Sequence, residues 1–216
     1  MLNATVVIDP GHGGTVEVNG SSWNNAISAS GVLEKVITLQ FGLLVRDALL
    51  ERNNADLKLT VVMTRQTDVN LGLTERANVA RTHKAARFLS IHCNGFNKQS
   101  RGVETLIRSA ADGNVNAEQD RAFAQRVQKA VFETILKFDK ATKDRGVKEQ
   151  RVGVLNDAAL GNTPQSKPCR ACLVEIEFID VEAVDKLLVT NTNAHEVRAA
   201  IASAMAQAIV DDIRAG

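Results

Sequence analysis

An α/β fold, with a single mostly parallel, twisted sheet of about six strands and helices on both faces, is the architecture that the sequence predicts. Short runs rich in β-branched and apolar residues alternate along the chain with amphipathic helical patterns, which is typical of a parallel sheet covered on both faces. The 216 residues, of which 44% are hydrophobic, suffice for one buried core, and no repeat or linker divides them. We therefore expect one domain over residues 1–216.

The first elements follow from composition and spacing. Residues 4–8 are a β-rich run, which Pro10 and the glycines after it end. Residues 15–30 are small and polar and predict a long loop, and loops of this length are often functional. Residues 31–54 carry apolar side chains at helical spacing and predict an amphipathic helix that stops at Asn53.

The remaining elements are expected on the same grounds. Apolar alternation predicts strands at 57–65, 87–94, 102–109 and 170–180, and one or two short extended segments within 144–155. Helical periodicity predicts helices at 73–85, with Thr74 as N-cap, and at 117–138, 181–188 and 192–214.

Charge and aromatic content exclude several classes of function. The 26 basic and 25 acidic side chains nearly cancel, no cluster of five or more Lys or Arg occurs, and the chain has no Tyr and one Trp. We therefore expect no nucleic-acid partner. The longest apolar stretches, such as residues 41–45, fall far short of the roughly 20 residues that span a bilayer, so no transmembrane segment is expected. No signal peptide precedes the first predicted strand, which leaves the export route open.

The cysteines Cys93, Cys169 and Cys172 are too few for a disulfide scaffold. Cys169 and Cys172 have C-x-x-C spacing, but neither a thioredoxin-like context nor a second ligand pair accompanies them. We interpret them as one loop cysteine and one strand cysteine, which could form a disulfide in an oxidising compartment.

Titratable side chains follow the carboxyl ends of three predicted strands. His12 lies just past the first strand, His92 at the end of the third, and Glu175 toward the end of the last. Because ligands bind outside the carboxyl ends of the strands in open α/β sheets, we expect these side chains at one sheet edge. Glu34, at the start of the first helix and just after the long loop, could reach the same edge.

Two histidines and two glutamates match the inventory of a catalytic zinc site, in which three nitrogen or oxygen ligands leave a fourth position for water and a separate carboxylate acts as base. Each residue alone also has an ordinary interpretation: His12 as a turn residue, His92 as a core histidine, Glu34 as a first-turn acid favoured by the helix dipole. Alternation places Glu175 and Glu177 on one face of an apolar strand, where carboxylates are costly unless paired or bound to metal.

Other catalytic motifs are missing. The sequence has no H-E-x-x-H and no G-x-S-x-G, and the glycines of residues 9–14 lack the Lys-Ser/Thr ending of a P-loop. His83 and His195 lie on predicted helices and are expected at the surface.

Taken together, several ordered segments resemble a known family. The segments VVIDPGHGG, GVLEK, TRQTDVNLGLTERANVA, FLSIHCNG, GVETLI, RGVK and CLVEIEFID follow one another between about residues 4 and 188. In this order they are similar to the zinc-dependent N-acetylmuramoyl-L-alanine amidases, the amidase_3 group of cell-wall hydrolases.

The resemblance implies cleavage of the amide between the lactyl group of N-acetylmuramic acid and L-alanine of the peptidoglycan stem peptide. It implies one zinc ion held by His12, Glu34 and His92. Glu175 would take a proton from the attacking water and pass one to the leaving amine. Asp9 is expected to hydrogen-bond His12 and so fix its tautomer.

The chain departs from the family pattern at two positions. Glu177 stands where the family usually has a small residue, and a like charge there would raise the pKa of Glu175. Cys93 directly follows His92, and we expect its thiol to pack away from the site because neighbouring strand residues point to opposite faces.

The resemblance also implies action on the cell wall, in the periplasm or outside the cell. Some family members carry a long inserted helix that blocks the zinc until a partner removes it. Here roughly 35 residues separate the LIRS and RGVK segments, which one ordinary helix of about 20 residues fills. We therefore expect an open site without an obligatory activator, a monomer, and substrate affinity supplied by the catalytic cleft.

Two alternatives stay open at this point. A zinc peptidase acting elsewhere on the stem peptide would use similar residues, and a non-catalytic wall-binding module could keep the same fold. The presence of all four presumed site residues argues against the second.

Overall fold

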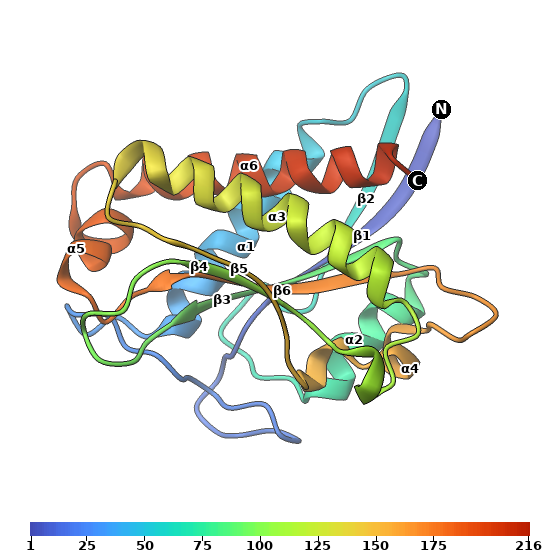
Figure 1. The fold of residues 1–216 in the computed structure, drawn as a ribbon, viewed down its shortest axis with the longest axis horizontal. Helices are drawn as coiled ribbons and strands as arrows, with labels where there is room; N and C mark the ends of the chain where they lie inside the picture. Colours follow the sequence, from blue (N-terminus) through green and yellow to red (C-terminus); the bar gives the residue numbers. More distant parts are fainter.

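The sheet of this protein has six strands in the order β2-β1-β3-β6-β4-β5, in a computed structural model that describes residues 1–216 (Figure 1). The strands are β1 (Leu2–Pro10), β2 (Leu57–Met63), β3 (Arg87–Asn94), β4 (Val103–Ile107), β5 (Asp144–Glu149) and β6 (Arg170–Phe178). Strands β1, β2, β3 and β6 run parallel, whereas β4 pairs antiparallel with β6 and β5 runs parallel to β4. The predicted mostly parallel sheet is confirmed.

Helices cover both faces of the sheet. On one face α1 (Glu34–Leu50), α3 (Ala117–Phe138) and α6 (Ala194–Arg214) pack together, and on the other lie α2 (Leu73–Thr82) and the short α4 (Asp157–Leu160) (Figure 1). The remaining turns are α5 (Glu182–Asp185), a π-helical turn at Lys186–Thr190, and 3₁₀ turns at Ala110–Asp112 and Gly153–Leu155. None of the helices combines the length and the apolar character that crossing a lipid bilayer requires.

Alternate strand residues supply two hydrophobic cores, one on each face. On β1, Val6 and Ile8 pack toward α1 and α6, whereas Val7 packs toward α2, and all three are fully buried. Burying one such side chain contributes about 1.5–3 kcal/mol. Because both faces are covered, the strands are apolar on both sides, which explains their nearly continuous hydrophobic runs.

The structure corrects some local expectations. Helix α2 begins after Gly72 rather than at a Thr74 cap, and the backbone N–H of Gly72 donates to Glu75 Oε2 at 2.9 Å. Residues 157–160, for which no helix is predicted, form α4 because the Asn156 side chain accepts from the Ala159 N–H. His83 and His195 are exposed, as expected.

The cysteines form no disulfide, and all three are buried free thiols. Cys169 belongs to the core on the α2 side and Cys172 to the core on the α1 side, so the sheet separates the two thiols. The interpretation that Cys169 and Cys172 could form a disulfide is therefore wrong for this fold. Cys93 packs in the α1-side core, as expected.

Candidate active site

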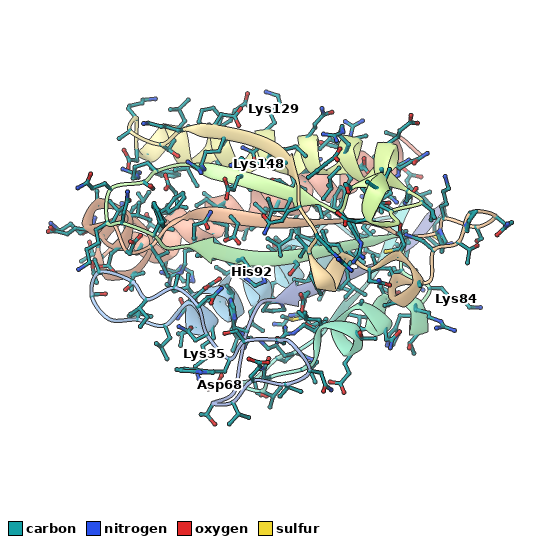
Figure 2. All side chains as sticks on the ribbon, turned by 60° about the horizontal axis from the view of Figure 1, so that its bottom comes forward. Lys35, Asp68, Lys84, His92, Lys129 and Lys148 are labelled. Atoms are coloured by element: carbon teal, nitrogen blue, oxygen red, sulfur yellow. The ribbon has the colours of Figure 1, made fainter.

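The carboxyl ends of β1, β3 and β6 meet at one edge of the sheet, and the predicted site residues gather there. His92 on β3 is the register partner of Glu175 on β6, His12 lies two residues past β1, and Glu34 is the first residue of α1. His92 points to the face of the sheet that Figure 2 turns toward the viewer. The expected convergence of these four residues is confirmed.

A strained turn carries His12. Its φ angle of 64° lies in the left-handed region that side chains other than glycine rarely adopt. Gly13, with φ 134°, has no space for a side chain, because a Cβ there would lie 2.0 Å from the Val69 carbonyl oxygen. A Cβ on Gly11 would lie 2.2 Å from Cε1 of His92. Gly11 thus allows the His92 ring to pack directly on the backbone that leads to His12.

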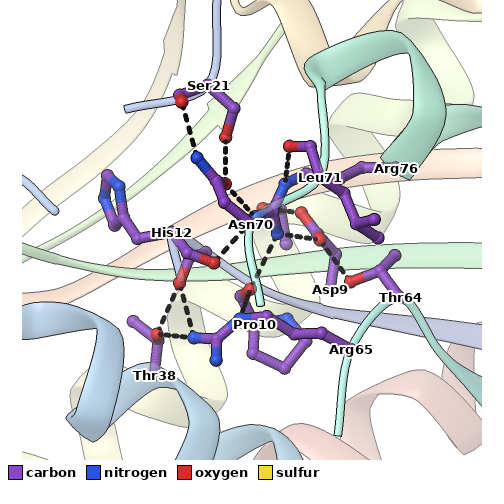
Figure 3. Close-up of polar contacts among 12 residues, drawn as sticks. Asp9, Pro10, His12, Ser21, Thr38, Thr64, Arg65, Asn70, Leu71 and Arg76 are labelled. Carbon is purple, nitrogen blue, oxygen red and sulfur yellow. Dashed lines mark hydrogen bonds and ion pairs between the residues drawn. The ribbon is translucent and has the colours of Figure 1, made fainter. Parts of the chain in front are cut away.

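Two buried arginines hold the backbone of this turn (Figure 3). Arg65 donates to the carbonyl oxygens of Pro10 and Gly11 at 2.9 and 2.8 Å. Arg76, on α2, donates to the carbonyl oxygens of Pro10 and His12 at 2.9 and 2.7 Å. The carbonyls of three consecutive residues are therefore all bound to guanidinium groups, which offsets the strain at His12.

Asp9 forms an ion pair with Arg76 and does not contact the imidazole of His12. Its carboxylate accepts from Arg76 at 2.9 Å, from the Thr64 hydroxyl at 2.6 Å and from the Ser90 hydroxyl at 2.7 Å. Burial alone would raise the pKa of Asp9, but the Arg76 charge and these hydrogen bonds outweigh it and lower the pKa. The expected Asp9–His12 hydrogen bond is wrong, because the Asp9 oxygens are bound to Arg76, Thr64 and Ser90.

The backbone of the long loop orients the His12 ring instead. Nδ1 of His12 lies 2.9 Å from the carbonyl oxygen of Ser22. A carbonyl oxygen only accepts, so Nδ1 carries the proton and Nε2 keeps its lone pair in the neutral ring. Nε2 is buried and has no hydrogen-bond partner. An orphaned, buried nitrogen with a free lone pair is the arrangement expected of a metal ligand.

Glu34 completes a group that could hold a metal ion. Its Oε1 lies 3.2 Å from Nε2 of His12 and 3.1 Å from Nδ1 of His92, and the ligand atoms of the three residues lie within 4.8 Å of one another. Backbone N–H groups fix the carboxylate, Ala26 donating to Oε2 at 2.9 Å and Cys93 to Oε1 at 3.0 Å. Burial would raise the pKa of Glu34, but the two adjacent histidines hold it below its usual value.

Glu175 lies beside this group and is unpaired. Its Oε2 is buried without a hydrogen-bond partner. Burial raises the pKa of Glu175 well above the usual value, and the negative charges of Glu34 and Glu104 raise it further. A carboxyl group with a raised pKa at a sheet edge is suited to accept and return a proton near neutral pH.

Glu177 lies apart from these residues because the strand is irregular. Between Glu175 and Phe178, β6 has one residue more than the facing segment of β3, a β-bulge that breaks the alternation. The Glu177 carboxylate is fully buried and accepts from Arg101 at 3.1 Å and from the hydroxyl of Thr142, in the loop after α3, at 2.8 Å. The expectation that Glu177 shares a face with Glu175 is therefore wrong.

A pocket of about 170 Å³ opens onto the site. Its lining includes His12, His92, Arg76, Leu73, Val152 and Leu173. A larger groove of about 330 Å³ runs between α3 and α6 and contains none of the predicted site residues. Helix α3, which connects β4 to β5, packs against α6 on the other face of the sheet (Figure 1). None of the residues that line the pocket belongs to α3.

Sequence reasoning gave no role to the residues that support the site. Arg76 is 2% exposed although it is charged, and it lies on the same side of α2 as the buried Ala77 and Ala80. A charged residue at helical spacing with core alanines is a signal of a buried ion pair. Lys35, which donates to the Gly14 carbonyl and to Asp68 at 2.7 Å each, was also unassigned; Figure 2 labels this pair.

Comparison with known proteins identifies relatives over most of the chain. Residues 6–207 match the sequence model of the Amidase_3 family, described as N-acetylmuramoyl-L-alanine amidase. The chain is 31% identical over 175 residues to the N-acetylmuramoyl-L-alanine amidase CwlM of Bacillus licheniformis, covering 81% of this chain and 56% of that protein. It thus spans about half the length of that relative.

Solved structures of amidases have the same fold. The catalytic domain of the N-acetylmuramoyl-L-alanine amidase CwlV from Bacillus (Paenibacillus) polymyxa var. colistinus is 26% identical, with a TM-score of 0.71 over 96% of this chain and 97% of that one. An N-acetylmuramoyl-L-alanine amidase from Clostridium difficile 630 is 25% identical, with a TM-score of 0.73 over 98% of this chain and 97% of that one.

Proposed function

The chain belongs to the Amidase_3 family of N-acetylmuramoyl-L-alanine amidases, and from this membership we propose that it hydrolyses the amide between N-acetylmuramic acid and L-alanine of the peptidoglycan stem peptide. Residues 1–216 form the catalytic domain in this proposal. The site of action is the cell wall, and the substrate is a glycopeptide that enters the pocket beside His12 and His92.

One observation supports this function above the others. The orphaned Nε2 of His12 faces Oε1 of Glu34 and the ring of His92, and the unpaired Glu175 lies next to them. Two imidazole nitrogens and one carboxylate oxygen are an established ligand set for catalytic zinc, which leaves a position free for water or substrate. Zinc bound there supplies a Lewis acid that lowers the pKa of water and polarises a carbonyl.

The residues of the chain then have separate roles. His12, Glu34 and His92 hold the metal, and the Ser22 carbonyl keeps His12 in the ligating tautomer. Arg76 and Asp9 hold the backbone of the turn. Glu175 takes the proton of the attacking water and returns a proton to the L-alanine nitrogen, so that the amine leaves neutral.

The pocket is open without a partner in this proposal. The only long helix between β4 and β5 is α3, which packs against α6 and away from His12 and His92. We therefore expect activity from the purified chain without an added activator.

Mass spectrometry of purified peptidoglycan digested by this protein tests both which bond is cleaved and whether a metal ion is required. Digestion should release stem peptides that begin with free L-alanine, and a chelator should abolish their release until zinc is restored. A zinc peptidase would instead leave the lactyl amide intact and shorten the stem. Release of the same peptides in the presence of chelator would contradict the metal assignment, and no release by zinc-loaded protein would contradict the activity.

A further inference from the structure

A pair of cations lies on the same face as Glu175, two strands away. Arg145 and Lys148 on β5 both bind Oε2 of Glu104, Arg145 through Nε at 2.7 Å. Glu104 on β4 is the direct register partner of Glu175 on β6. Lys148 and His92 are both seen on the face that Figure 2 turns toward the viewer.

Irregularities in two strands bring these side chains together. Residues three apart on a regular strand point to opposite faces. On β5 the segment from Asp144 to Val147 faces only two steps of β4, and Gly146 has φ 75°, so one extra residue turns Arg145 and Lys148 to the same side. The bulge on β6 does the same for Phe178, whose ring lies 5.0 Å from the Arg145 guanidinium carbon.

The arrangement leaves positive charge and donors unused. Glu104 is one carboxylate against two cations, so the cluster carries an excess of one positive charge at neutral pH. Arg145 uses only Nε for Glu104, and its two terminal nitrogens donate to no protein atom. The Arg145 and Lys148 side chains are 34% and 43% exposed, while Glu104 is 13% exposed. A guanidinium stacked on a ring and anchored by one edge is preorganised to bind a carboxylate with the other.

The distance between Glu175 and the Arg145 guanidinium determines which residue of a bound stem peptide would contact Arg145 and Lys148. Neighbouring strands lie roughly 4.8 Å apart, and the Arg145 guanidinium is anchored over β4, one strand from Glu175. A peptide advances at most about 3.5 Å per residue. The group within reach is therefore on the second residue of the stem peptide.

We propose that Arg145 and Lys148 form a carboxylate-binding subsite that recognises the free α-carboxylate of the second stem residue, an isoglutamate linked through its γ-carboxyl group. This inference rests on the proposed function, because it takes the substrate from there. Glu104 and Phe178 are positioning residues that hold the guanidinium, and Arg145 supplies the specificity. A stem whose second residue is isoglutamine, with a neutral carboxamide at the same place, is bound less tightly.

Two muramoyl dipeptides that differ only in this group provide the test: N-acetylmuramoyl-L-alanyl-D-isoglutamate and its isoglutamine counterpart, both with the γ-carboxyl group capped as a methylamide so that only the α-position carries or lacks a charge. We expect wild-type enzyme to favour the carboxylate by about 10-fold or more in kcat/KM, mainly through KM, as is typical of a charge-assisted hydrogen bond. Arg145→Gln should bring the ratio close to one, Lys148→Gln should reduce it less, and Arg145→Lys should keep part of it. The ratio should also fall with added salt.

A matched control and a second measurement keep the outcomes distinct. Lys129→Gln removes an exposed lysine on α3 and should leave the ratio unchanged. Calorimetric binding of both dipeptides to zinc-loaded Glu175→Gln protein measures the preference without turnover. A binding preference that Arg145→Gln removes supports the subsite even if neither dipeptide is cleaved, an outcome that overturns only the proposed reaction. Equal binding of the two dipeptides, or a preference that survives in Arg145→Gln, overturns the subsite.

Discussion

Glu175 and Glu177 lie two residues apart near the end of β6, Glu175 just before a β-bulge and Glu177 within it, and only Glu177 has partners for its charge. The Glu177 carboxylate accepts from Arg101, Thr142, the Gly102 N–H and the Phe178 N–H. The Glu175 carboxylate has a buried oxygen with no partner, and its charged neighbours Glu34 and Glu104 are both acidic.

The difference separates a structural carboxylate from a reactive one. A buried charge is costly unless it is paired and hydrogen-bonded, so Glu177 stabilises the junction of β4, β6 and the loop after α3. Glu175 lowers the stability of the metal-free fold, because ionising it there is unfavourable. The extra residue in β6 directs the Glu175 and Glu177 carboxylates to different surroundings, although only one residue separates them in the sequence.

The largest expected effect is the loss of turnover when Glu175, the carboxylate without a partner, is replaced. Glu175→Gln keeps the shape of the side chain but removes the proton acceptor, so we expect turnover of peptidoglycan to fall by about 10²–10⁴-fold. Bound zinc, measured by elemental analysis, should stay at one ion per chain. The free energy of unfolding of the metal-free variant should equal or exceed that of the wild type. Retained turnover would contradict the role given to Glu175.

Replacing Glu177, the hydrogen-bonded carboxylate, should instead lower the stability of the fold. Glu177→Gln leaves Arg101 and Thr142 without their charged acceptor, and we expect the free energy of unfolding to fall by about 3 kcal/mol in urea denaturation. Glu133→Gln, at a carboxylate that is 53% exposed on α3, is the control and should cost less than about 0.5 kcal/mol. A loss for Glu177→Gln as small as that of the control would show that its hydrogen bonds add little.

Glu104 is paired with two cations but is less buried than Glu177, so its replacement should have the smallest effect on the free energy of unfolding. Burial would raise its pKa, but Lys148, Arg145 and Asn94 outweigh it and lower the pKa to about 2. A lowered pKa in the folded state stabilises the protein above the unfolded value of 4.5, and this contribution is lost as the pH falls from there toward 2. We expect ionised Glu104 to contribute about 1 kcal/mol to the free energy of unfolding, since Arg145 and Lys148 are partly solvated.

Comparison of wild type and Glu104→Gln by urea denaturation at pH 7, 4.5 and 3 measures this contribution. The difference in the free energy of unfolding should be largest at pH 7 and should shrink toward pH 3. A difference that does not change with pH would mean that Glu104 stabilises the fold by shape rather than by charge.

The elements and the gathering of the candidate site were predictable from local pattern. The strand and helix periods identify the sheet, and the carboxyl ends of parallel strands necessarily meet at one edge, which places His12, His92 and Glu175 together. Glu34 was predictable because it opens the helix after the long loop. Each of these inferences uses only the spacing of residues along the chain.

The supports of the site depend on contacts between distant segments, and they were not predictable in the same way. The partner of Asp9 is Arg76 rather than His12, since α2 packs across the end of β1. The tautomer of His12 is set by the Ser22 carbonyl, whose place depends on the course of the long loop.

By itself, the sequence determined the α/β architecture and which side chains reach one sheet edge, because alternation and helical periodicity are written in neighbouring residues. Only the tertiary structure decided that Glu177 turns away from Glu175 and that Arg145 and Lys148 share a face. A bulge adds one residue to one strand relative to its partner, so it exists only in the pairing of the two strands.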